Sequence, residues 1–385
     1  MTLNCPDPVW IDSADELASI LPYWLEQPML AVDTEFMRSD TFYPILGLIQ
    51  VSDGEQCWLV DPLAKMSIEP LSRLFNSTEV LKVFHACSED LEVLHQAFQK
   101  TPQHIFDTQV AAAFIGEGFG CGYNRLLQQM LHVELDKHET RSDWLQRPLT
   151  RSQCHYAAED VYYLYHLYQR IAQTLSDQQR YDWVMEDMLQ LLDKAQNNPI
   201  SPNTYYQKVK GAWKLNQRQL AALKLLCEWR EQQAMQLNRP RGRVVKDNEL
   251  LTIAIKQPGN LSQLAEQTGL HSGQIRRHGE SLLALLDNAA LVNENELPEL
   301  LPEKLTGDSK ALFRKIRSLI EALAQQHAIA KEQLASKQDI EQLSRCWMEK
   351  EQVTGRLGSG WRAELANPTL EQLLVEFAKS HEETV

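Results

Sequence analysis

The stretch MLAVDTEF, residues 29–36, decides the expected fold, because it is apolar up to Asp33 and is typical of a buried strand. Two more strand-like stretches follow it after short polar breaks: ILGLIQVSD (45–53) and CWLVDP (57–62). Their spacing favours a meander of paired strands, so we expect the first 60 residues to be built from strands.

After Pro62 the pattern alternates between helix and strand. The expected order is a helix in IEPLSRLFN (68–76), a strand in VLKVFHA (80–86) and a helix in SEDLEVLHQAF (88–98) with Ser88 as its N-cap. From about residue 108 to residue 195 the chain is mainly helical in pattern. Strands followed by alternating units imply an α/β domain over residues 1–195, with a mixed sheet and helices on its faces.

A change of composition separates this domain from an all-α remainder. QNNPISPNTY (196–205) has two prolines and three asparagines, and we expect a linker over residues 196–209. Two similar sets of amphipathic helices follow, which hint at a duplicated module covering residues 210–290 and again 291–385. The sets are RQLAALKLLCEWREQQA (218–234), NELLTIAIK (248–256) and NLSQLAEQT (260–268), then KALFRKIRSLIEALAQQHA (310–328), KEQLASKQDIEQL (331–343) and TLEQLLVEFA (369–378).

The net charge of −14 is unevenly distributed along the chain. Residues 1–200 carry 13 basic and 29 acidic side chains (−16), residues 201–290 carry 13 and 7 (+6), and residues 291–385 carry 12 and 16 (−4). The basic middle region could favour a polyanion, although solvated helix faces would also account for it.

Composition and cysteine usage indicate a cytoplasmic protein. With 43% hydrophobic and 23% charged residues, the chain resembles ordinary soluble proteins, and neither a signal peptide nor a membrane span is recognisable. The seven cysteines contain no CxxC pair and are expected to be reduced thiols: Cys5, Cys57, Cys87, Cys121, Cys154, Cys227 and Cys346.

The first strand carries two acids, Asp33 and Glu35. Side chains at positions i and i+2 point to the same face of a strand, and two acids there are costly unless a cation offsets them. Mg²⁺ would do so, because it prefers carboxylate oxygens. Asp90 in the first turn of the helix 88–98 is a candidate ligand too, although acids are common there because of the helix dipole alone.

HYAAEDVYYL, residues 155–164, adds Asp160 and two candidate proton-handling groups, His155 and Tyr156. On a helix, Tyr156 lies one turn before Asp160, whereas His155 is turned away from it. His155 would matter only if the helix began later. Four acids can hold two divalent cations, Mg²⁺ or Mn²⁺, around a phosphate, with the tyrosine orienting the attacking water.

Three segments of the chain resemble the motifs of the DEDD exonucleases, and among these the bacterial ribonuclease D family: VDTEF (32–36), FHACSEDLEVL (84–94) and YAAEDVYYL (156–164). IFDTQVAAAF (105–114) and SDWLQRPLT (142–150) resemble further blocks of the family. The resemblance implies a ribonuclease H-like domain, metal ligation by Asp33, Glu35, Asp90 and Asp160, and a water-positioning role for Tyr156. The pattern around Tyr156 is that of the tyrosine branch.

Further family blocks contain candidate supporting residues. Asp107 is typical of a helix N-cap, so we expect it to support the site and not to bind metal. Trp144 and Arg147 could contact nucleotide by stacking and by phosphate pairing, although packing roles account for them equally well.

The segment 237–258 is the most basic part of the middle module, and four of its side chains are expected to contact phosphate: Arg239, Arg241, Arg243 and Lys246. Residues 210–290 resemble the helicase-and-ribonuclease-D C-terminal (HRDC) domain, a nucleic-acid-binding module. Residues 295–380 resemble a more divergent copy, whose negative charge argues against direct RNA binding.

The resemblance implies a 3′-to-5′ exoribonuclease that releases nucleoside 5′-monophosphates from precursor tRNA and other small structured RNAs. We expect a monomer, because three domains can enclose a substrate without a partner. A DNA 3′ exonuclease would use the same carboxylates. A nonenzymatic RNA-binding protein would be expected to have lost one of the acids. A metal-independent hydrolase that uses His155 or a cysteine lacks a convincing base.

Overall fold

The computed structural model describes residues 3–135, 139, 142–197, 202–346, 353 and 355–382. The chain divides into two compact units. The first contains residues 1–37, 46–196 and 305–385, and the second contains residues 38–45 and 197–304. The N-terminal domain and the last helices therefore belong to one unit, and the helices between them form the other.

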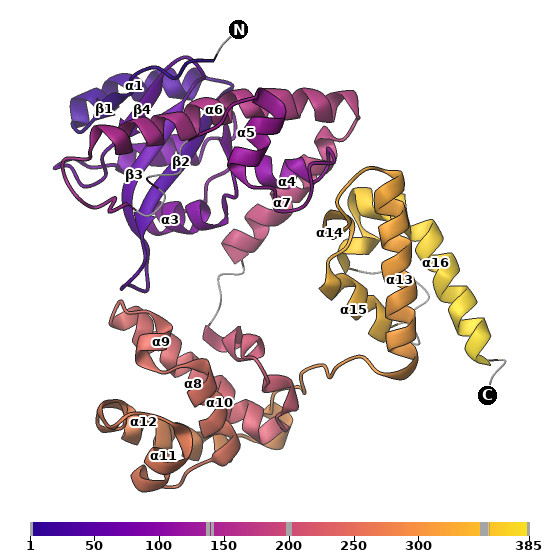
Figure 1. Cartoon of the computed structure of the whole chain (residues 1–385). Helices are drawn as coiled ribbons and strands as arrows, with labels where there is room; N and C mark the ends of the chain where they lie inside the picture. Colours follow the sequence, from indigo (N-terminus) through magenta and orange to yellow (C-terminus); the bar gives the residue numbers. More distant parts are fainter. Residues whose placement is uncertain are drawn as a thin grey trace. The chain divides into compact units, whose positions relative to one another are not determined.

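The first unit is built around a six-stranded sheet with the order β1-β4-β3-β2-β5-β6 (Figure 1). β3 and β4 are antiparallel, whereas β1 with β4, β2 with β5 and β5 with β6 are parallel. The predicted mixed sheet is thereby confirmed. Its strands are β1 (Val9–Ile11), β2 (Met29–Met37), β3 (Ile45–Ser52), β4 (Cys57–Val60), β5 (Leu81–Phe84) and β6 (Ile105–Asp107).

Helices pack on this sheet, as the alternating pattern predicted. α6 packs against β2, β4 and β5, and α3 packs against β2. These helices are α1 (Ala14–Glu26), α2 (Ser72–Phe75), α3 (Ser88–Phe98), α4 (Thr108–Ala112), α5 (Tyr123–Leu131), α6 (Arg151–Asp177) and α7 (Tyr181–Asn197), with the 3₁₀ helix η1 (Glu69–Leu71) before α2.

The expectation that the first 60 residues are all strand is wrong for α1. Ser13 caps this helix by accepting a hydrogen bond from the Glu16 N–H at 3.4 Å. Leu17, Leu21 and Trp24 recur at helical spacing and are buried, at 1%, 3% and 0% exposure. A capped amphipathic helix buries these side chains on one face, which an alternating strand could not do.

The second unit is all-helical and has its own core, which Leu220, Leu223, Leu226 and Ile253 help to form. The loop between β2 and β3 is part of it, because Phe42 is 7% exposed within that core. Its elements are η2 (Pro202–Lys208), η3 (Ala212–Lys214), α8 (Gln217–Gln236), α9 (Arg241–Val244), α10 (Asp247–Lys256), α11 (Leu261–Thr268), α12 (Ser272–Leu291) and η4 (Glu294–Glu296).

Part of the expected linker is folded into this second unit. η2 lies within it, and Tyr206 and Val209 are 7% and 4% exposed. The Tyr205 ring also packs 4.6 Å from the Arg230 guanidinium. Aromatic packing thus overrides the turn-forming composition of this segment, whose residues 198–201 lie outside the described residues.

The last helices share one hydrophobic core with the sheet domain. They are α13 (Gly307–Gln326), α14 (Lys331–Leu334), α15 (Lys337–Cys346), η5 (Gly355–Gly358) and α16 (Gly360–Glu382). The helix expected over residues 331–343 is broken, because Ser336 and Asp339 exchange side chain to main chain hydrogen bonds of 2.8 and 3.2 Å that start a new helix. The α/β domain followed by two helical modules is nevertheless as predicted.

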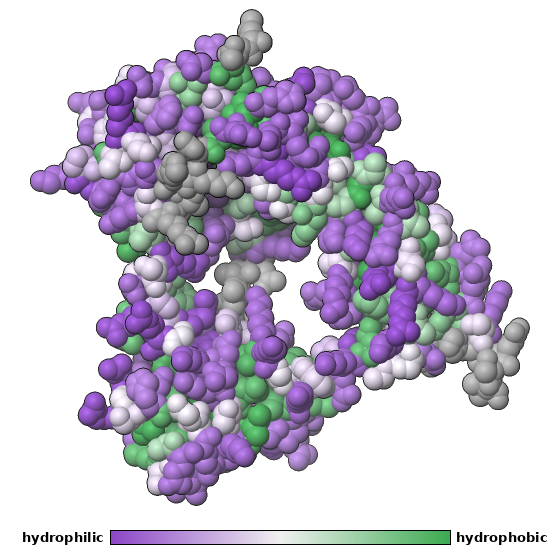
Figure 2. Space-filling model, viewed as in Figure 1, coloured by the Kyte–Doolittle hydropathy of each residue, from purple (hydrophilic) through white to green (hydrophobic). Residues whose placement is uncertain are grey.

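The apolar side chains are concentrated in these cores. On the face seen in Figure 2, hydrophilic residues dominate the surface of each unit. Within the described ranges, no helix is both long and apolar enough to cross a bilayer.

Candidate active site

β2 places Asp33 and Glu35 near the middle of the sheet, between β3 and β5. Both side chains are half-buried, and Thr34 between them is 5% exposed. The Thr34 hydroxyl donates a 2.5 Å hydrogen bond to the Asp90 carboxylate. Thr34, which lies between Asp33 and Glu35 on β2, therefore connects this pair of acids directly to Asp90 on α3.

Asp90 lies in the first turn of α3 and is 7% exposed. Cys87, and not Ser88 as expected, occupies the N-cap position, and its side chain makes no capping bond. The turn before α3 is instead held by Asp107, whose carboxylate accepts the main-chain N–H groups of Ala86 and Cys87 at 3.0 and 2.9 Å. Asp107 also caps α4, so the expectation that it supports the site agrees with its contacts.

Asp160 is 8% exposed on α6, which begins well before it. Thr150 and Gln153 form a capping box at the start of α6, so the chain is already helical at residues 155 and 156. Tyr156 consequently lies one turn before Asp160, and its hydroxyl hydrogen-bonds the Asp160 carboxylate.

His155 points away from the carboxylates. Its side chain is 55% exposed, and its Nε2 lies 3.5 Å from the Glu159 carboxylate one turn further along α6. The condition under which His155 would reach the site, a later start of the helix, is not met. Of the two candidates in this stretch, the structure brings only Tyr156 to Asp160.

Burial raises the pKa of all four carboxylates, and the charges of neighbouring members of the set raise it further at Asp33 and Glu35. Burial first, and then the charges of Asp90, Asp160 and Glu35, raise the pKa of Asp33 well above its ordinary value. Burial and the charges of Asp160 and Asp90 raise the pKa of Glu35 to about 9. Burial also raises the pKa of Asp160 to about 7 and of Asp90 to about 6, although hydrogen bonds from Tyr156 and Thr34 oppose it. The site is thus short of positive charge.

The donor set fits a hard divalent cation. Within the described part of the chain, none of the four carboxylates forms an ion pair with a lysine, arginine or histidine. Four carboxylates with raised pKa values, two of them raised in part by their neighbours' charges, are suited to Mg²⁺ or Mn²⁺. Among the same residues, no three His, Cys, Asp or Glu side chains stand ready-made around one point, so the carboxylates are neighbours without forming a closed coordination sphere.

Two of the expected nucleotide contacts have structural roles instead. Trp144 is 2% exposed and packs with Leu48, Leu59 and Ala157, with its ring centroid 6.2 Å from that of Tyr156. Gly47 makes room for this segment, because a Cβ there would lie 2.8 Å from the Trp144 carbonyl oxygen. Trp144 is therefore a buried packing partner of Tyr156, and its ring is not available to stack on a base.

Arg147 is the second such residue. Its guanidinium donates to both carboxylate oxygens of Asp61, at 2.8 and 2.6 Å, and to the Gly47 carbonyl oxygen at 2.6 Å. A guanidinium that already forms a bidentate pair has few donors left for phosphate. Arg147 ties the segment after Trp144 to β3 and β4.

The basic segment of the second unit is only partly free. Arg241 pairs with the buried Glu231 at 2.6 Å and lies over the Phe42 ring, which corrects the expectation that it contacts phosphate. Arg243 is 71% exposed and forms a surface pair with Asp40 at 3.1 Å. Arg239 and Lys246 are exposed as well, so three of the four expected side chains reach solvent.

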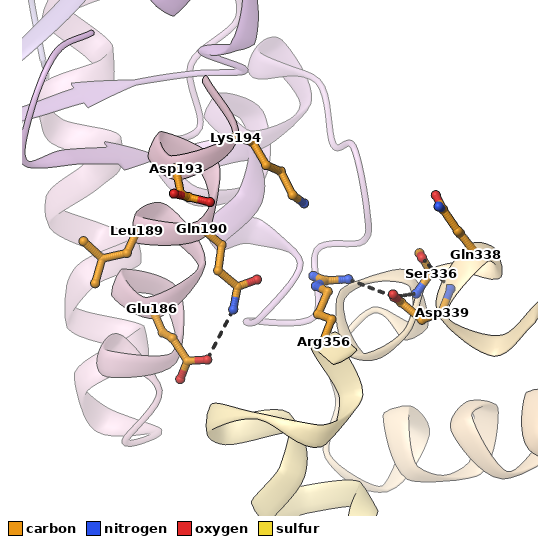
Figure 3. Close-up of a pocket in the computed structure, with 9 residues that line it drawn as sticks. All are labelled: Glu186, Leu189, Gln190, Asp193, Lys194, Ser336, Gln338, Asp339 and Arg356. Carbon is orange, nitrogen blue, oxygen red and sulfur yellow. Dashed lines mark hydrogen bonds and ion pairs between the residues drawn. The ribbon is translucent and has the colours of Figure 1, made fainter. Parts of the chain in front are cut away.

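A pocket of about 790 Å³ lies elsewhere in the first unit, between α7 and the C-terminal helices (Figure 3). It is lined by Glu186, Leu189, Gln190, Asp193, Lys194, Ser336, Gln338, Asp339 and Arg356. Three acidic and two basic side chains are among the residues that line it, and none of the expected site residues is. The pocket is therefore separate from the carboxylate cluster.

Sequence reasoning missed two polar side chains next to the carboxylates. Thr34 could have been found, because it stands between two candidate ligands. Tyr123 could not, since only the fold brings its hydroxyl within 2.6 Å of the Asp160 carbonyl oxygen and its ring within 5.2 Å of the His85 ring. Both side chains hold ligand-bearing elements in place.

Three family models match the chain. A 3′-5′ exonuclease model matches residues 8–176, an HRDC domain model matches residues 219–286, and a model of the ribonuclease D C-terminal HRDC domain matches residues 308–370. Ribonuclease D of Pseudomonas paraeruginosa is 40% identical over 343 residues, covering 89% of this chain and 91% of that protein. Ribonuclease D of Escherichia coli K12 is 38% identical over 373 residues, covering 95% and 98%.

Solved structures agree with this. The crystal structure of Escherichia coli RNase D, described as an exoribonuclease involved in structured RNA processing, is similar with a TM-score of 0.88 at 35% identity, covering 96% of this chain and 99% of that one. The catalytic core of RRP6 from Trypanosoma brucei shares the fold, with a TM-score of 0.57 at 23% identity over 75% of this chain and 81% of that one.

Proposed function

The chain belongs to the ribonuclease D family, and from this premise we propose that it shortens RNA from the 3′ end with two divalent cations held by Asp33, Glu35, Asp90 and Asp160. Its exoribonuclease activity follows from the family, whose exonuclease domain depends on divalent metal ions. The observation that carries the proposal is the cluster itself: four carboxylates from three elements all have a raised pKa, Asp33 and Glu35 partly through the charges of Asp90 and Asp160, and no lysine, arginine or histidine of the described residues pairs with them.

Each protein group has a role in this proposal. Bound cations would polarise the scissile phosphate and favour ionisation of the attacking water. Tyr156 hydrogen-bonds Asp160, which favours the ionised carboxylate, and its hydroxyl would orient that water. Trp144 packs against Tyr156 and limits the positions that the tyrosine ring can adopt.

The proposed substrates are precursor tRNA and other small structured RNAs, shortened to nucleoside 5′-monophosphates by a cytoplasmic monomer. Structured RNA processing is what the Escherichia coli relative is described as doing. The exposed Arg239, Arg243 and Lys246 support phosphate contacts by the second unit, whose segment 201–290 has a net charge of +6.

The experiment that tests the proposal uses 5′-labelled single-stranded RNA, with and without Mg²⁺, resolved at single-nucleotide steps over time. We expect a ladder that shortens from the 3′ end only when metal is present. A matched DNA strand tests the choice of sugar, since the carboxylates act on phosphate. Intact RNA under conditions where binding is demonstrated would contradict the proposal.

A further inference from the structure

The turn that delivers Asp90 to the site has a strained backbone. Ala86, between β5 and α3, has a φ of 60°, a left-handed conformation that residues with a Cβ seldom adopt. The Ser88 N–H closes the turn by donating to the Ala86 carbonyl oxygen at 2.9 Å. Such a conformation persists only where neighbouring groups fix the backbone in it, and residues fixed in this way tend to lie at functional sites.

Asp107 is the clamp on this turn. Its side chain is 2% exposed, and its carboxylate accepts four main-chain N–H groups. Two come from the strained turn, Ala86 at 3.0 Å and Cys87 at 2.9 Å, and two from the first turn of α4, Gln109 at 2.8 Å and Val110 at 3.3 Å. One buried side chain therefore fixes the start of α3 relative to the start of α4.

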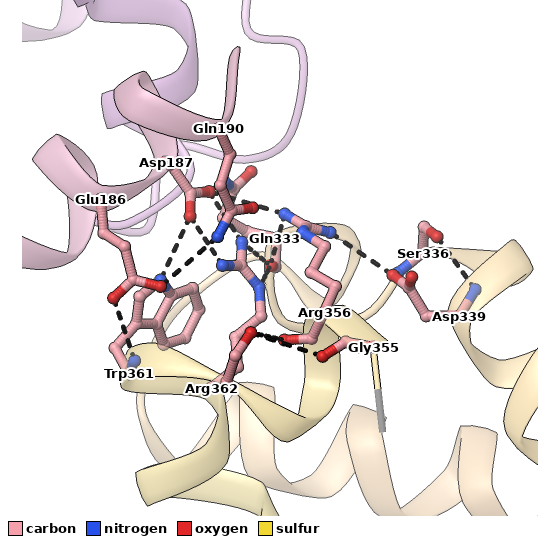
Figure 4. A network of polar contacts seen from close by, with 11 residues as sticks. Glu186, Asp187, Gln190, Gln333, Ser336, Asp339, Gly355, Arg356, Trp361 and Arg362 are labelled. Atoms are coloured by element: carbon pink, nitrogen blue, oxygen red, sulfur yellow. Dashed lines mark hydrogen bonds and ion pairs between the residues drawn. The ribbon is translucent and has the colours of Figure 1, made fainter. Parts of the chain in front are cut away.

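Asp107 is in turn seated against α7. Its main-chain N–H donates to the sulfur of Met188 at 3.2 Å, and Met188 is 1% exposed. The preceding residue on α7, Asp187, is 6% exposed and accepts both arms of the Arg362 guanidinium, at 2.6 and 2.7 Å (Figure 4). Adjacent residues of one helix thus contact the Asp107 segment and the C-terminal module.

The contact with the C-terminal module is extensive and buried. Arg362 is fully buried, and it also donates to the Gln333 carbonyl oxygen at 3.0 and 2.8 Å (Figure 4). The Trp361 indole N–H donates to Asp187 at 3.2 Å, and its ring stacks on Trp183 at 5.0 Å.

A second connection joins the module to the end of α4. The Ala330 N–H donates to the Ala113 carbonyl oxygen at 2.8 Å, and the Phe114 ring packs edge-on against Trp361 at 5.2 Å. Because Asp107 caps the other end of α4, the C-terminal module touches both elements that seat Asp107.

We infer that Asp107 is a positioning residue for Asp90, and that the C-terminal module, residues 307–382, acts through α7 and α4 to hold it. The module is thereby a structural part of the exonuclease site and not a separate RNA-binding domain. Its charge is consistent with this, since residues 291–385 have a net charge of −4 and Arg362 is occupied by Asp187. The inference rests on the proposed role of Asp90.

Asp107→Asn tests the first link. Asparagine still offers one oxygen that can cap α4, but it places an NH₂ group against the Cys87 N–H. We expect kcat to fall about 10- to 100-fold, as for other residues that orient a ligand, with little change in KM. Amide hydrogen exchange of the metal-free protein should become faster in residues 84–91.

Asn260→Ala is the matched control for loss of a helix cap, because Asn260 caps α11 in the second unit by accepting the Gln263 N–H at 3.0 Å. It should leave kcat and the exchange of residues 84–91 unchanged. Normal kcat in Asp107→Asn, with or without faster exchange, would overturn the positioning role.

Arg362→Gln tests the second link, and Trp361→Phe is a milder variant that keeps the ring stack but loses the hydrogen bond to Asp187. Both should lower kcat and speed exchange in residues 84–91 and 105–112 while RNA affinity stays the same. Lys331→Gln, which breaks an exposed pair with Glu321 inside the same module, is the control and should change none of these.

The outcomes separate the hypotheses. Loss of RNA affinity at unchanged kcat in Trp361→Phe or Arg362→Gln would show an RNA-binding module and overturn the inference. Should Arg362→Gln not fold, Trp361→Phe alone decides. Asp90→Asn is measured in the same assays. If Asp90→Asn retains activity, the proposed carboxylate set is wrong. If Asp90→Asn is inactive and Asp107→Asn is fully active, only the positioning role of Asp107 is contradicted.

Discussion

The two helical modules each bury an arginine, but the two arginines bind different partners. Arg230 on α8 is 1% exposed and pairs with Glu231 and Asp247 of its own module. Arg362 on α16 is fully buried and pairs with Asp187 of the exonuclease domain. Arg230 therefore stabilises the module over residues 210–290 from within, whereas Arg362 joins the C-terminal module to the exonuclease domain.

The cores show the same difference. The module over residues 210–290 has a hydrophobic core of its own, which also takes in Phe42 of the β2–β3 loop, whereas the C-terminal module shares the core of the sheet. Two modules of similar helical pattern thus serve different purposes: the first offers exposed basic side chains to solvent, and the second uses its buried cations for domain packing.

Asp160→Asn should have the largest effect. It should remove catalysis while both helical modules stay intact, so it separates the role of the carboxylates from the roles of the modules. We expect turnover to fall on the order of 10³-fold or more, as for other members of a catalytic unit, with RNA affinity retained. Single-turnover kinetics and a filter-binding titration measure the two quantities. Substantial remaining turnover would remove Asp160 from the site.

Asp187→Asn and Asp247→Asn compare the two buried arginines directly. Losing Asp187 leaves Arg362 buried without its partner and should lower the free energy of unfolding of the first unit by about 3–5 kcal/mol. Arg230 keeps Glu231, and the Asp247 side chain is 44% exposed, so its loss should cost about 1 kcal/mol or less. Denaturant-induced unfolding, monitored by amide hydrogen exchange, measures both losses of stability. Equal losses would show that the two buried arginines depend on these acids to the same extent.

Tyr156→Phe leaves both modules untouched and sets the scale of a loss confined to the site. Removing its hydroxyl should lower kcat about 100-fold, in the range of general acid–base groups. His155→Ala should change kcat little, because the imidazole is exposed and pairs with Glu159. The reverse ranking in steady-state assays would return the role to His155.

The charge difference between the modules predicts different salt dependences. Changing Arg239, Arg243 and Lys246 together to Gln should reduce the slope of log K against log salt by about 2, at roughly 0.7 per phosphate contact on single strands. The matched control changes the exposed Lys310, Arg314 and Arg317 on α13 and should leave the slope as it was. A smaller slope in the control would show that the C-terminal module also binds phosphate.

The last prediction concerns the pH dependence of stability. Burial raises the pKa of Glu35 to about 9 and of Asp160 to about 7, so the folded protein holds more protons than the unfolded chain above pH 4. Stability of the metal-free protein should therefore fall as pH rises towards 9. Mn²⁺ competes with these protons, and we expect it to raise Tm more at pH 8 than at pH 6. An equal rise at both values would contradict the assignment.

Several parts of the site were predictable because they depend on local geometry. Asp33 and Glu35 share a strand, and Tyr156 and Asp160 lie one helical turn apart, so period alone indicates which side chains meet. The preference for Tyr156 over His155 required that the helix begin before residue 155, and the capping box of Thr150 and Gln153 shows that it does.

Other parts depend on contacts between residues far apart in the chain. Trp144 and Arg147 were open to two interpretations until the fold placed one in a hydrophobic cluster and the other on Asp61. The repeat of Leu17, Leu21 and Trp24 indicates a helix only once the face they bury is known.

The sequence by itself indicated the sheet domain, the helical modules and the pairs Asp33–Glu35 and Tyr156–Asp160, because strand and helix periods are local, and the family resemblance added Asp90 to the expected set. Only the tertiary structure decided that Asp107 clamps the Asp90 turn and that the C-terminal module joins the catalytic domain. The Arg362–Asp187 pair spans 175 residues. Such a partnership leaves no periodic signal in either segment, because burial and distance arise only when the chain has folded.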